Sequence, residues 1–246
     1  MKIVTTSWDD GDIRDLRIAD LLLKHGMRGS FYVPLKAFRG QPSLSHDHMR
    51  QMTSCGLEIG AHGVDHEIMS EIPEDVTMQV VTTSKQVLEQ ALGAEVPMFC
   101  YPRGRFASYT IPCLQKAGYR GARTTRMLST SRQFDKFMMP TSSQVYPHPP
   151  VRYMRNLARA KNVSGMFDYV FRLHGEQDWV KIGKTLFDRV DADGGIWHLY
   201  GHSWEIDELG LWDGFEELLK YVSGREDVLY ITNGEALQYS AASNWN

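Results

Sequence analysis

Residues 5–11 read Thr-Thr-Ser-Trp-Asp-Asp-Gly, and they end the first apolar run of the chain on two adjacent carboxylates. The β-branched residues that open this run, from Ile3 to Thr6, favour a buried strand. Two acids do not suit a core, because burying an unpaired carboxylate is very costly. We therefore expect a positive charge to face Asp9 and Asp10.

Length and composition limit the classes of protein to which the chain can belong. The chain has 246 residues, which is enough for one α/β barrel or for two smaller domains. A net charge of −3 gives no reason to expect nucleic acid or an anionic membrane as a partner. No apolar run approaches the about 20 residues that a membrane crossing needs. No signal peptide is visible either, so the sequence predicts a cytoplasmic protein.

Short apolar strands alternate with amphipathic helices along most of the chain. Strands are expected at 3–6, 29–33, 57–61, 98–101, 119–125, 196–200 and 228–231, with helices between them. About seven such units imply a parallel sheet, either open or closed into a barrel. Residues 126–175 show no clean period and contain several prolines, so we expect an irregular excursion over a site there.

Residues capable of chemistry fall at the predicted carboxyl ends of these strands, where parallel α/β folds place their sites. Asp9 and Asp10 end the first strand, His62 and His66 follow the third, and His198 and His202 lie on and just beyond the strand at 196–200. Two histidines at i and i+4 point the same way if the turn between them is helical. With one carboxylate they make a site of the kind that zinc takes in hydrolases.

The order of these motifs resembles that of the polysaccharide deacetylases, the NodB-homology carbohydrate esterases. The T-F-D-D-G motif of that family matches residues 7–11, its H-[ST]-x-x-H motif matches 62–66, and its R-x-P-[YFW]-G motif matches 100–104. A strand ending in a histidine matches the region 198–202. The resemblance implies an α/β fold, a distorted (β/α)7 barrel, formed as one domain by residues 1–246.

The resemblance also implies a function. The chain would be a metal-dependent hydrolase that removes an N-acyl group, N-acetyl first, from an amino sugar or sugar conjugate, in the context of surface-glycan biosynthesis. Asp10, His62 and His66 would hold a divalent metal, zinc first, with Co²⁺ or Ni²⁺ as alternatives. Asp9 would be the general base.

The remaining roles come from the later motifs. The backbone N–H of Arg103 would help to hold the oxyanion. A late histidine would protonate the departing amine; we favour His202, which is nearer the rim, over His198. Tyr101, Pro102 and Arg103 occupy the third motif, which makes them candidates for substrate contact. Trp204 is the best candidate for stacking on a sugar ring.

Three departures from the family pattern affect these roles. Cys100 stands where the family supplies an arginine that pairs with the base, so Arg123 or Arg103, preferably Arg123, would have to restore that pairing. The fourth motif, an acid that orients the late histidine, has no counterpart in residues 126–175. The third departure is the segment 201–205, which is richer than the usual ending of the family, and its Glu205 could take over the role of the missing acid.

Other interpretations remain open from the sequence. The two aspartates could cap the next helix, and any of the histidines could be a surface or core residue. A non-catalytic carbohydrate-binding or regulatory protein on the same barrel is the alternative function. A deformylase or another C–N hydrolase is a third.

Overall fold

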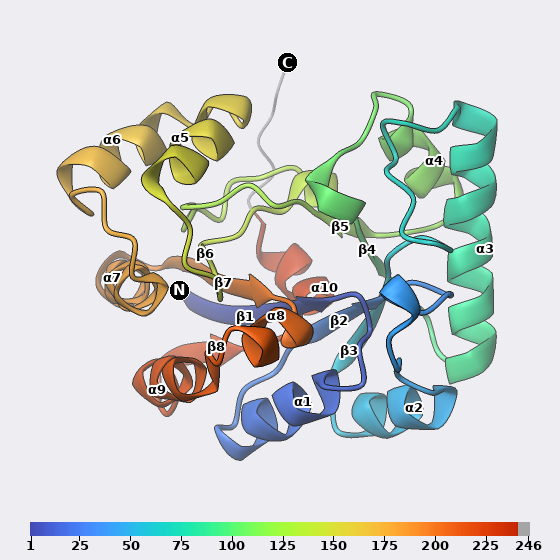
Figure 1. Cartoon of the computed structure of the whole chain (residues 1–246), viewed down its shortest axis with the longest axis horizontal. Coiled ribbons are helices and arrows are strands. Elements are labelled where there is room, and N and C mark those ends of the chain that lie inside the picture. Colours follow the sequence, from blue (N-terminus) through green and yellow to red (C-terminus); the bar gives the residue numbers. More distant parts are fainter. Residues whose placement is uncertain (241–246) are drawn as a thin grey trace.

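An all-parallel β-sheet forms the centre of the molecule, and helices lie between its strands in the sequence and around it in space (Figure 1). The computed structural model describes residues 1–240. The strands are β1 (Lys2–Asp9), β2 (Ser30–Val33), β3 (Glu58–Ala61), β4 (Met98–Cys100), β5 (Gly121–Arg123), β6 (Ser143–Gln144), β7 (Gly195–Gly201) and β8 (Val228–Tyr230).

Strand β1 is the middle of the sheet. The strand order is β5-β4-β3-β2-β1-β7-β6, and β8 pairs with the first residues of β1. The segment between the 3-10 turn η3 (Lys136–Met138) and β6 brings the two ends of this order together, because Met139 bridges Arg123 of β5 while Ser143 of β6 pairs with Leu199 of β7. The sheet is therefore curled, and the predicted distorted (β/α)7 barrel is confirmed.

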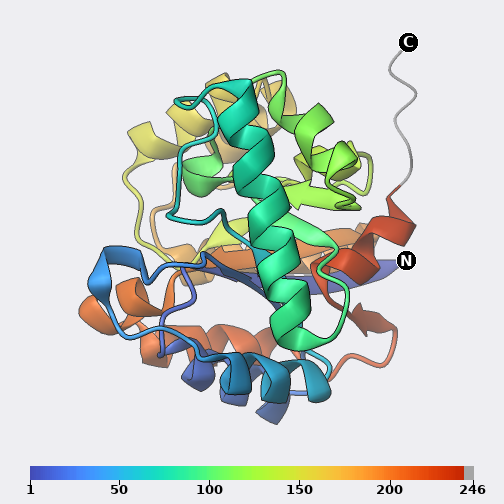
Figure 2. The ribbon, with the colours of Figure 1, turned by 90° about the vertical axis from the view of Figure 1, so that its right-hand side faces the viewer.

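Ten α-helices surround this sheet in residues 1–240. They are α1 (Asp15–Lys24), α2 (His46–Ser54), α3 (Glu74–Leu92), α4 (Thr110–Lys116), α5 (Pro150–Arg159), α6 (Val163–Phe171), α7 (Trp179–Asp193), α8 (Ser203–Glu208), α9 (Trp212–Val222) and α10 (Asn233–Ala236). Figure 1 shows α1 and α2 on one side of the sheet and the α5–α6 pair on the other, and Figure 2 shows α3 along the flank. Over residues 1–240, no helix combines the length and the apolar character that a membrane crossing needs.

The stretch 126–175 is more regular than expected. It contains the 3-10 turn η3 (Lys136–Met138), strand β6 and helices α5 and α6. Prolines that the sequence analysis took as breaks instead begin a helix: Pro149 is the N-cap of α5 and Pro150 its first residue. Proline suits that position, because the first helical N–H has no partner within the helix and the φ of proline is already helical.

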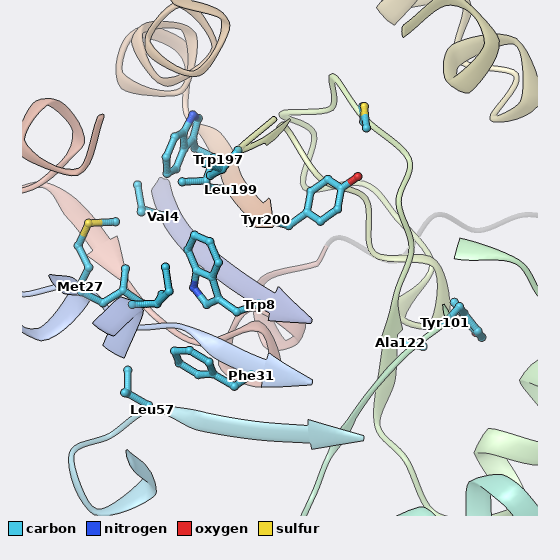
Figure 3. Packing of buried hydrophobic residues seen from close by; sticks show 14 of the residues in the cluster. Val4, Trp8, Met27, Phe31, Leu57, Tyr101, Ala122, Trp197, Leu199 and Tyr200 are labelled. Carbon is cyan, nitrogen blue, oxygen red and sulfur yellow. The ribbon is translucent and has the colours of Figure 1, made fainter. Parts of the chain in front are cut away.

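The main core lies between the sheet and the helices. Figure 3 shows Trp8 of β1 beside Phe31 of β2, which are partners in the strand register. The indole of Trp8 also packs edge-on against Phe215 of α9, with ring centroids 5.0 Å apart. All three side chains are fully buried. Burial of such aromatic surface supplies much of the stability of a fold.

The opposite face of β1 points into the barrel, and its side chains change from apolar to polar along the strand. Ile3 belongs to an apolar cluster inside the barrel. Thr5 is hydrogen-bonded to the side chain of Asn233 at 2.8 Å, and Ser7 to His198 at 2.8 Å. Asp9 is next in this alternation. The barrel interior is thus apolar at one end and polar at the end where the strands finish.

Glu58 closes the apolar end of the barrel. Its carboxylate accepts hydrogen bonds from Ser30 Oγ at 2.6 Å, Thr232 Oγ1 at 3.4 Å and the N–H of Gly234 at 3.1 Å, and so holds α10 to β2 and β3. Burial raises the pKa of Glu58 to about 7, although these hydrogen bonds act in the opposite direction. Between pH 4.5 and about 7, the folded chain therefore holds a proton on Glu58 that the unfolded chain releases.

We expect a pH-dependent contribution of Glu58 to stability. Because its pKa rises from 4.5 to about 7 on folding, its contribution to the free energy of unfolding is complete below pH 4.5 and is lost as the pH rises to 7, by at most about 3 kcal/mol. Glu58→Gln cannot titrate. Urea unfolding of both proteins between pH 4.5 and 8 should show the wild-type stability falling relative to the variant. A constant difference across this range would contradict the assignment.

Candidate active site

The two aspartates of the opening motif reach one pocket because the backbone leaves the strand between them. In a regular strand their side chains would point to opposite faces. Asp10 has φ +78°, followed by Gly11 at +61°, and both carboxylates line the same cavity of about 690 Å³. A Cβ on Gly11 would lie 2.8 Å from Val33 Cγ1, so the tight turn also requires glycine for space.

Asp10 faces the two histidines of the loop that follows β3. The Oδ1 atom of Asp10 lies 3.6 Å from Nε2 of His62 and 3.6 Å from Nε2 of His66. That oxygen is buried and has no hydrogen-bond partner among residues 1–240. A buried carboxylate oxygen without a hydrogen-bond partner calls for an explanation, and a cation site supplies one. The donor set of one carboxylate and two imidazoles fits zinc or a similar divalent ion.

The hydrogen bonding and the pKa values of the two imidazoles suit metal binding. Nδ1 of His62 lies 2.9 Å from the carbonyl oxygen of Cys100, so it donates its proton there and leaves Nε2 free to bind an ion. Burial lowers the pKa of His62, and burial together with His62 lowers the pKa of His66 to about 4. Both rings are therefore neutral near pH 7, which is the form that binds a metal.

The turn between these histidines is not helical. Gly63 has φ +83° and His66 has φ +53°, yet the two rings still meet, with centroids 4.9 Å apart. Glu67 holds this loop, because its Oε2 accepts the backbone N–H groups of Val64 at 3.0 Å and Asp65 at 2.9 Å. The sequence analysis did not select Glu67, although an acid one residue after the motif was visible.

Arg123 supplies the positive charge beside Asp9. The side chain is fully buried at the end of β5, and its guanidinium donates to Asp9 Oδ1. Burial acts to raise the pKa of Asp9, but the charges of Arg123, His62 and His202 outweigh it and lower that pKa to about 2. Asp9 is therefore ionised throughout the neutral range.

The position of Arg123 explains how Cys100 can stand where an arginine was expected. Cys100 of β4 and Arg123 of β5 are direct partners in the parallel register, so their side chains point to the same side of the sheet. The guanidinium comes from the neighbouring strand and reaches the same carboxylate. Arg103 does not make this contact: it is exposed and lines the rim of the pocket.

The Asp9–His62–Cys100 group is a second possible ligand set, but it suits a metal less well. Asp9 is already paired with Arg123. Burial also raises the pKa of the Cys100 thiol well above its usual value, so the thiolate that a metal would need is disfavoured.

His202 lies on the other side of the aspartates and carries its own acidic partner. Its Nδ1 is 2.6 Å from Glu205 Oε2, and its Nε2 is 3.8 Å from Asp9 Oδ2. Burial lowers the pKa of His202, but the hydrogen bond to Glu205 and the charges of Asp10 and Asp9 prevail and raise it to about 9. Glu205 thus orients this ring and favours its protonated form.

His198 has a different environment. It is 1% exposed, with Nε2 at 2.8 Å from Ser7 Oγ and Nδ1 at 2.9 Å from the Pro140 carbonyl oxygen. Burial lowers its pKa to about 3. Both nitrogens are occupied and the residue does not line the pocket. His198 is therefore placed to brace β7 against β1 inside the barrel, and this position does not suit a proton donor to substrate.

The expected substrate contacts divide into two groups. Trp204 and Arg103 line the pocket, and the indole N–H of Trp204 donates to Asp10 Oδ2 at 2.9 Å. Tyr101 and Pro102 do not line it. Tyr101 is fully buried, stacks on Phe106 and donates its hydroxyl to the Phe137 carbonyl. The prediction that Tyr101 and Pro102 contact the substrate in this pocket is therefore wrong, because the chain directly after β4 directs the ring of Tyr101 into the core.

Gln144 is a pocket residue that the sequence analysis missed. Its Nε2 donates to Glu205 at 3.3 Å, and its Oε1 accepts from the Tyr200 hydroxyl at 2.6 Å and contacts His148 Nε2 at 2.7 Å. It therefore supports Glu205 from β6. No local motif marks it, because its partners come from distant segments.

Comparisons with known proteins agree with this geometry. Residues 1–122 match the family model described as polysaccharide deacetylase. YxkH of Bacillus subtilis (strain 168), assigned by its name to the polysaccharide deacetylases, is 25% identical over 132 residues. That match covers 53% of this chain and 47% of the relative, so the chain aligns with about half of the relative's length.

Solved structures share the fold at low identity. A crystal structure from Mycobacterium smegmatis, named for the same family, has a TM-score of 0.69 at 15% identity and covers 97% of this chain and 89% of that one. The chitin deacetylase of Colletotrichum lindemuthianum has a TM-score of 0.60 at 16% identity, covering 99% and 89%. BA3943 of Bacillus anthracis, a CE4 family pseudoenzyme, has a TM-score of 0.55 at 14% identity, covering 96% and 66%. The predicted resemblance to the polysaccharide deacetylase family is therefore confirmed.

Proposed function

We propose that the chain is a metal-dependent hydrolase that removes an N-acyl group, N-acetyl first, from an amino sugar or a sugar conjugate. The observation that carries the proposal is the convergence of three groups on one pocket. They are the Asp10–His62–His66 set, Asp9 with its buried arginine, and His202 with its own carboxylate. The family resemblance supports the same chemistry.

Asp10, His62 and His66 would hold the divalent metal, with zinc as the first candidate and Co²⁺ or Ni²⁺ as alternatives. When bound, such an ion polarises a carbonyl and lowers the pKa of water. The unpartnered Oδ1 of Asp10 and the two free imidazole nitrogens support this assignment. Trp204, which donates to the other oxygen of Asp10, would fix the orientation of the carboxylate.

The environments of the acid and the base move their pKa values in opposite directions. Asp9, with a pKa of about 2, is the ionised group and takes a proton from the attacking water. His202, with a pKa of about 9, is protonated and delivers a proton to the departing nitrogen. A pair of groups whose surroundings move their pKa values apart is typical of acid–base catalysis.

The oxyanion would be held by the backbone N–H of Arg103. This residue lies in the 3-10 turn η2 (Pro102–Gly104), with φ +56°. The first N–H groups of such a turn have no partner within it, so they can donate hydrogen bonds to an oxygen that develops negative charge.

A non-catalytic role is the alternative, since a pseudoenzyme shares this fold. The test is release of acetate and formate from a panel of N- and O-acylated sugars by the zinc-loaded protein. Acetate release from an N-acetyl sugar is expected, formate release would indicate a deformylase, and no release with metal bound would favour the binding protein. Asp9→Asn should lower kcat about 100-fold or more, because the general base is lost; unchanged turnover would exclude Asp9 as the base.

Zinc affinity tests the ligand set and its support. His62→Ala and His66→Ala should abolish tight binding, measured by competition with a chromogenic chelator. Trp204→Phe removes only the hydrogen bond to Asp10, so we expect about a tenfold to 100-fold loss. The matched control is Trp212→Phe, whose indole bonds Asp207 outside the pocket. Equal zinc affinities of the two tryptophan variants would show that Trp204 does not support the metal ligands.

The pH profile tests the pairing of His202 with Glu205. Activity should fall as the pH rises through the pKa of His202, because the proton donor is then lost. Glu205→Gln removes the carboxylate that stabilises the protonated ring, so the alkaline limb of kcat/KM should move to lower pH by on the order of one unit or more. Glu208→Gln, on the exposed part of the same helix, is the control. An unmoved limb in Glu205→Gln would assign that limb to another group.

A further inference from the structure

Arginine side chains crowd the pocket, and Arg103 is the one among them that already has a role above. Six of them line it, namely Arg39, Arg103, Arg105, Arg152, Arg155 and Arg159. An adjoining cavity of about 520 Å³ shares Arg105, Arg159, Thr125 and Asn156 with the pocket and adds Arg126. No aspartate or glutamate is among the described residues that line this second cavity. The chain as a whole carries a net charge of −3, so this concentration of cations is local.

Helix α5 presents three of these arginines on one face. Arg152, Arg155 and Arg159 are spaced i, i+3 and i+7, while Tyr153 and Leu157 are buried in the core. Like charges at these spacings oppose helix formation, and a cation in the first turn opposes the helix dipole. The helix contains no acidic residue that would offset this cost. Folding alone therefore does not explain the arrangement.

Most of these cations have no protein partner. Within residues 1–240, the guanidinium groups of four of these arginines make no ion pair and no hydrogen bond, namely those of Arg126, Arg152, Arg155 and Arg159. Arg105 is an exception, because it pairs with Glu71 at 2.6 Å.

The carboxylates of the pocket do not neutralise the arginine wall, that is, the three α5 arginines together with Arg126. Asp9 is paired with Arg123, Asp10 faces the two histidines, and Glu205 is bound to His202. The charge of the arginine wall is thus free to bind a ligand.

We propose that the second cavity and the α5 arginines form an anion subsite for a phosphate or diphosphate group on the substrate. Guanidinium groups bind phosphate oxygens in pairs with matched geometry, and several together suit a group with more than one negative charge. Because the cavity opens beside the acyl-transfer residues, the substrate is an acylamino sugar that carries this group. The sugar assignment rests on the proposed function, whereas anion binding does not.

Binding to the zinc-loaded protein tests the subsite without requiring turnover. Calorimetric titration would compare N-acetylglucosamine, its 1-phosphate, its uridine diphosphate conjugate and its conjugate to a short prenyl diphosphate. The phosphorylated sugars should bind at least tenfold more tightly than the neutral sugar, and this advantage should shrink as NaCl is raised. Stronger binding of the uridine or of the prenyl conjugate identifies the source of the diphosphate. Equal affinity for the neutral and phosphorylated sugars would overturn the subsite.

Arginine variants separate the subsite from direct binding of phosphate to zinc. The double variant Arg155→Gln with Arg159→Gln should lose about tenfold or more in affinity for the phosphorylated sugars and keep its affinity for the neutral one. Arg172→Gln, at the residue directly after α6, is the control, because this arginine is exposed and lines neither cavity. If the double variant retains the full phosphate advantage, the metal holds the anion and the proposal is wrong.

Turnover then distinguishes this proposal from the proposed function. Acetate release from the neutral sugar without any preference for phosphate would retain the hydrolase and overturn the subsite. A phosphate advantage that depends on the α5 arginines, with no acyl release from any sugar, would retain the subsite and overturn the hydrolase.

Discussion

The buried ion pair between Arg123 and Asp9 is the constraint on which the rest of the site depends. Both groups lie inside a barrel whose apolar end excludes water, so neither could remain charged alone. The pair fixes the end of β1 relative to the end of β5, although 114 residues separate the partners. Removing one member of such a pair typically costs about 3–5 kcal/mol, because the other is left buried and unpaired.

The surroundings of the pair explain how the arginine is tolerated. The guanidinium carbon of Arg123 lies 5.3 Å from the ring centroid of Tyr32 and 4.9 Å from that of Tyr200, and these π faces stabilise the cation. Asp9 also faces the protonated imidazole of His202, whose Nε2 lies 3.8 Å from Asp9 Oδ2. Each aspartate of the opening motif is therefore matched to a different partner: Asp9 to a fixed protein cation, and Asp10 to two neutral imidazoles.

Two supporting groups of this site come from positions different from those of the family pattern. The arginine sits on β5, one strand away from Cys100, and the acid that orients His202 sits three residues after it on α8. The Arg123 guanidinium reaches Asp9 from β5, and the Glu205 carboxylate reaches His202 from the first turn of α8. A motif match by residue type does not single out either group. The same reasoning applies to α5, whose arginines face the pocket from a stretch without any motif.

Outside residues 126–175, the sequence by itself determined the order of strands and helices, and it placed Asp9, Asp10, His62 and His66 at strand ends, because local periodicity and turn residues carry that information. It also left two candidates for the arginine that pairs with Asp9, and two for the histidine that would donate a proton. Only the tertiary structure decided that Arg123 contacts Asp9, that His198 is enclosed, that Tyr101 turns into the core and that Pro149 and Pro150 begin a helix. These outcomes depend on strand register and on contacts between residues far apart in the chain, which no local pattern encodes.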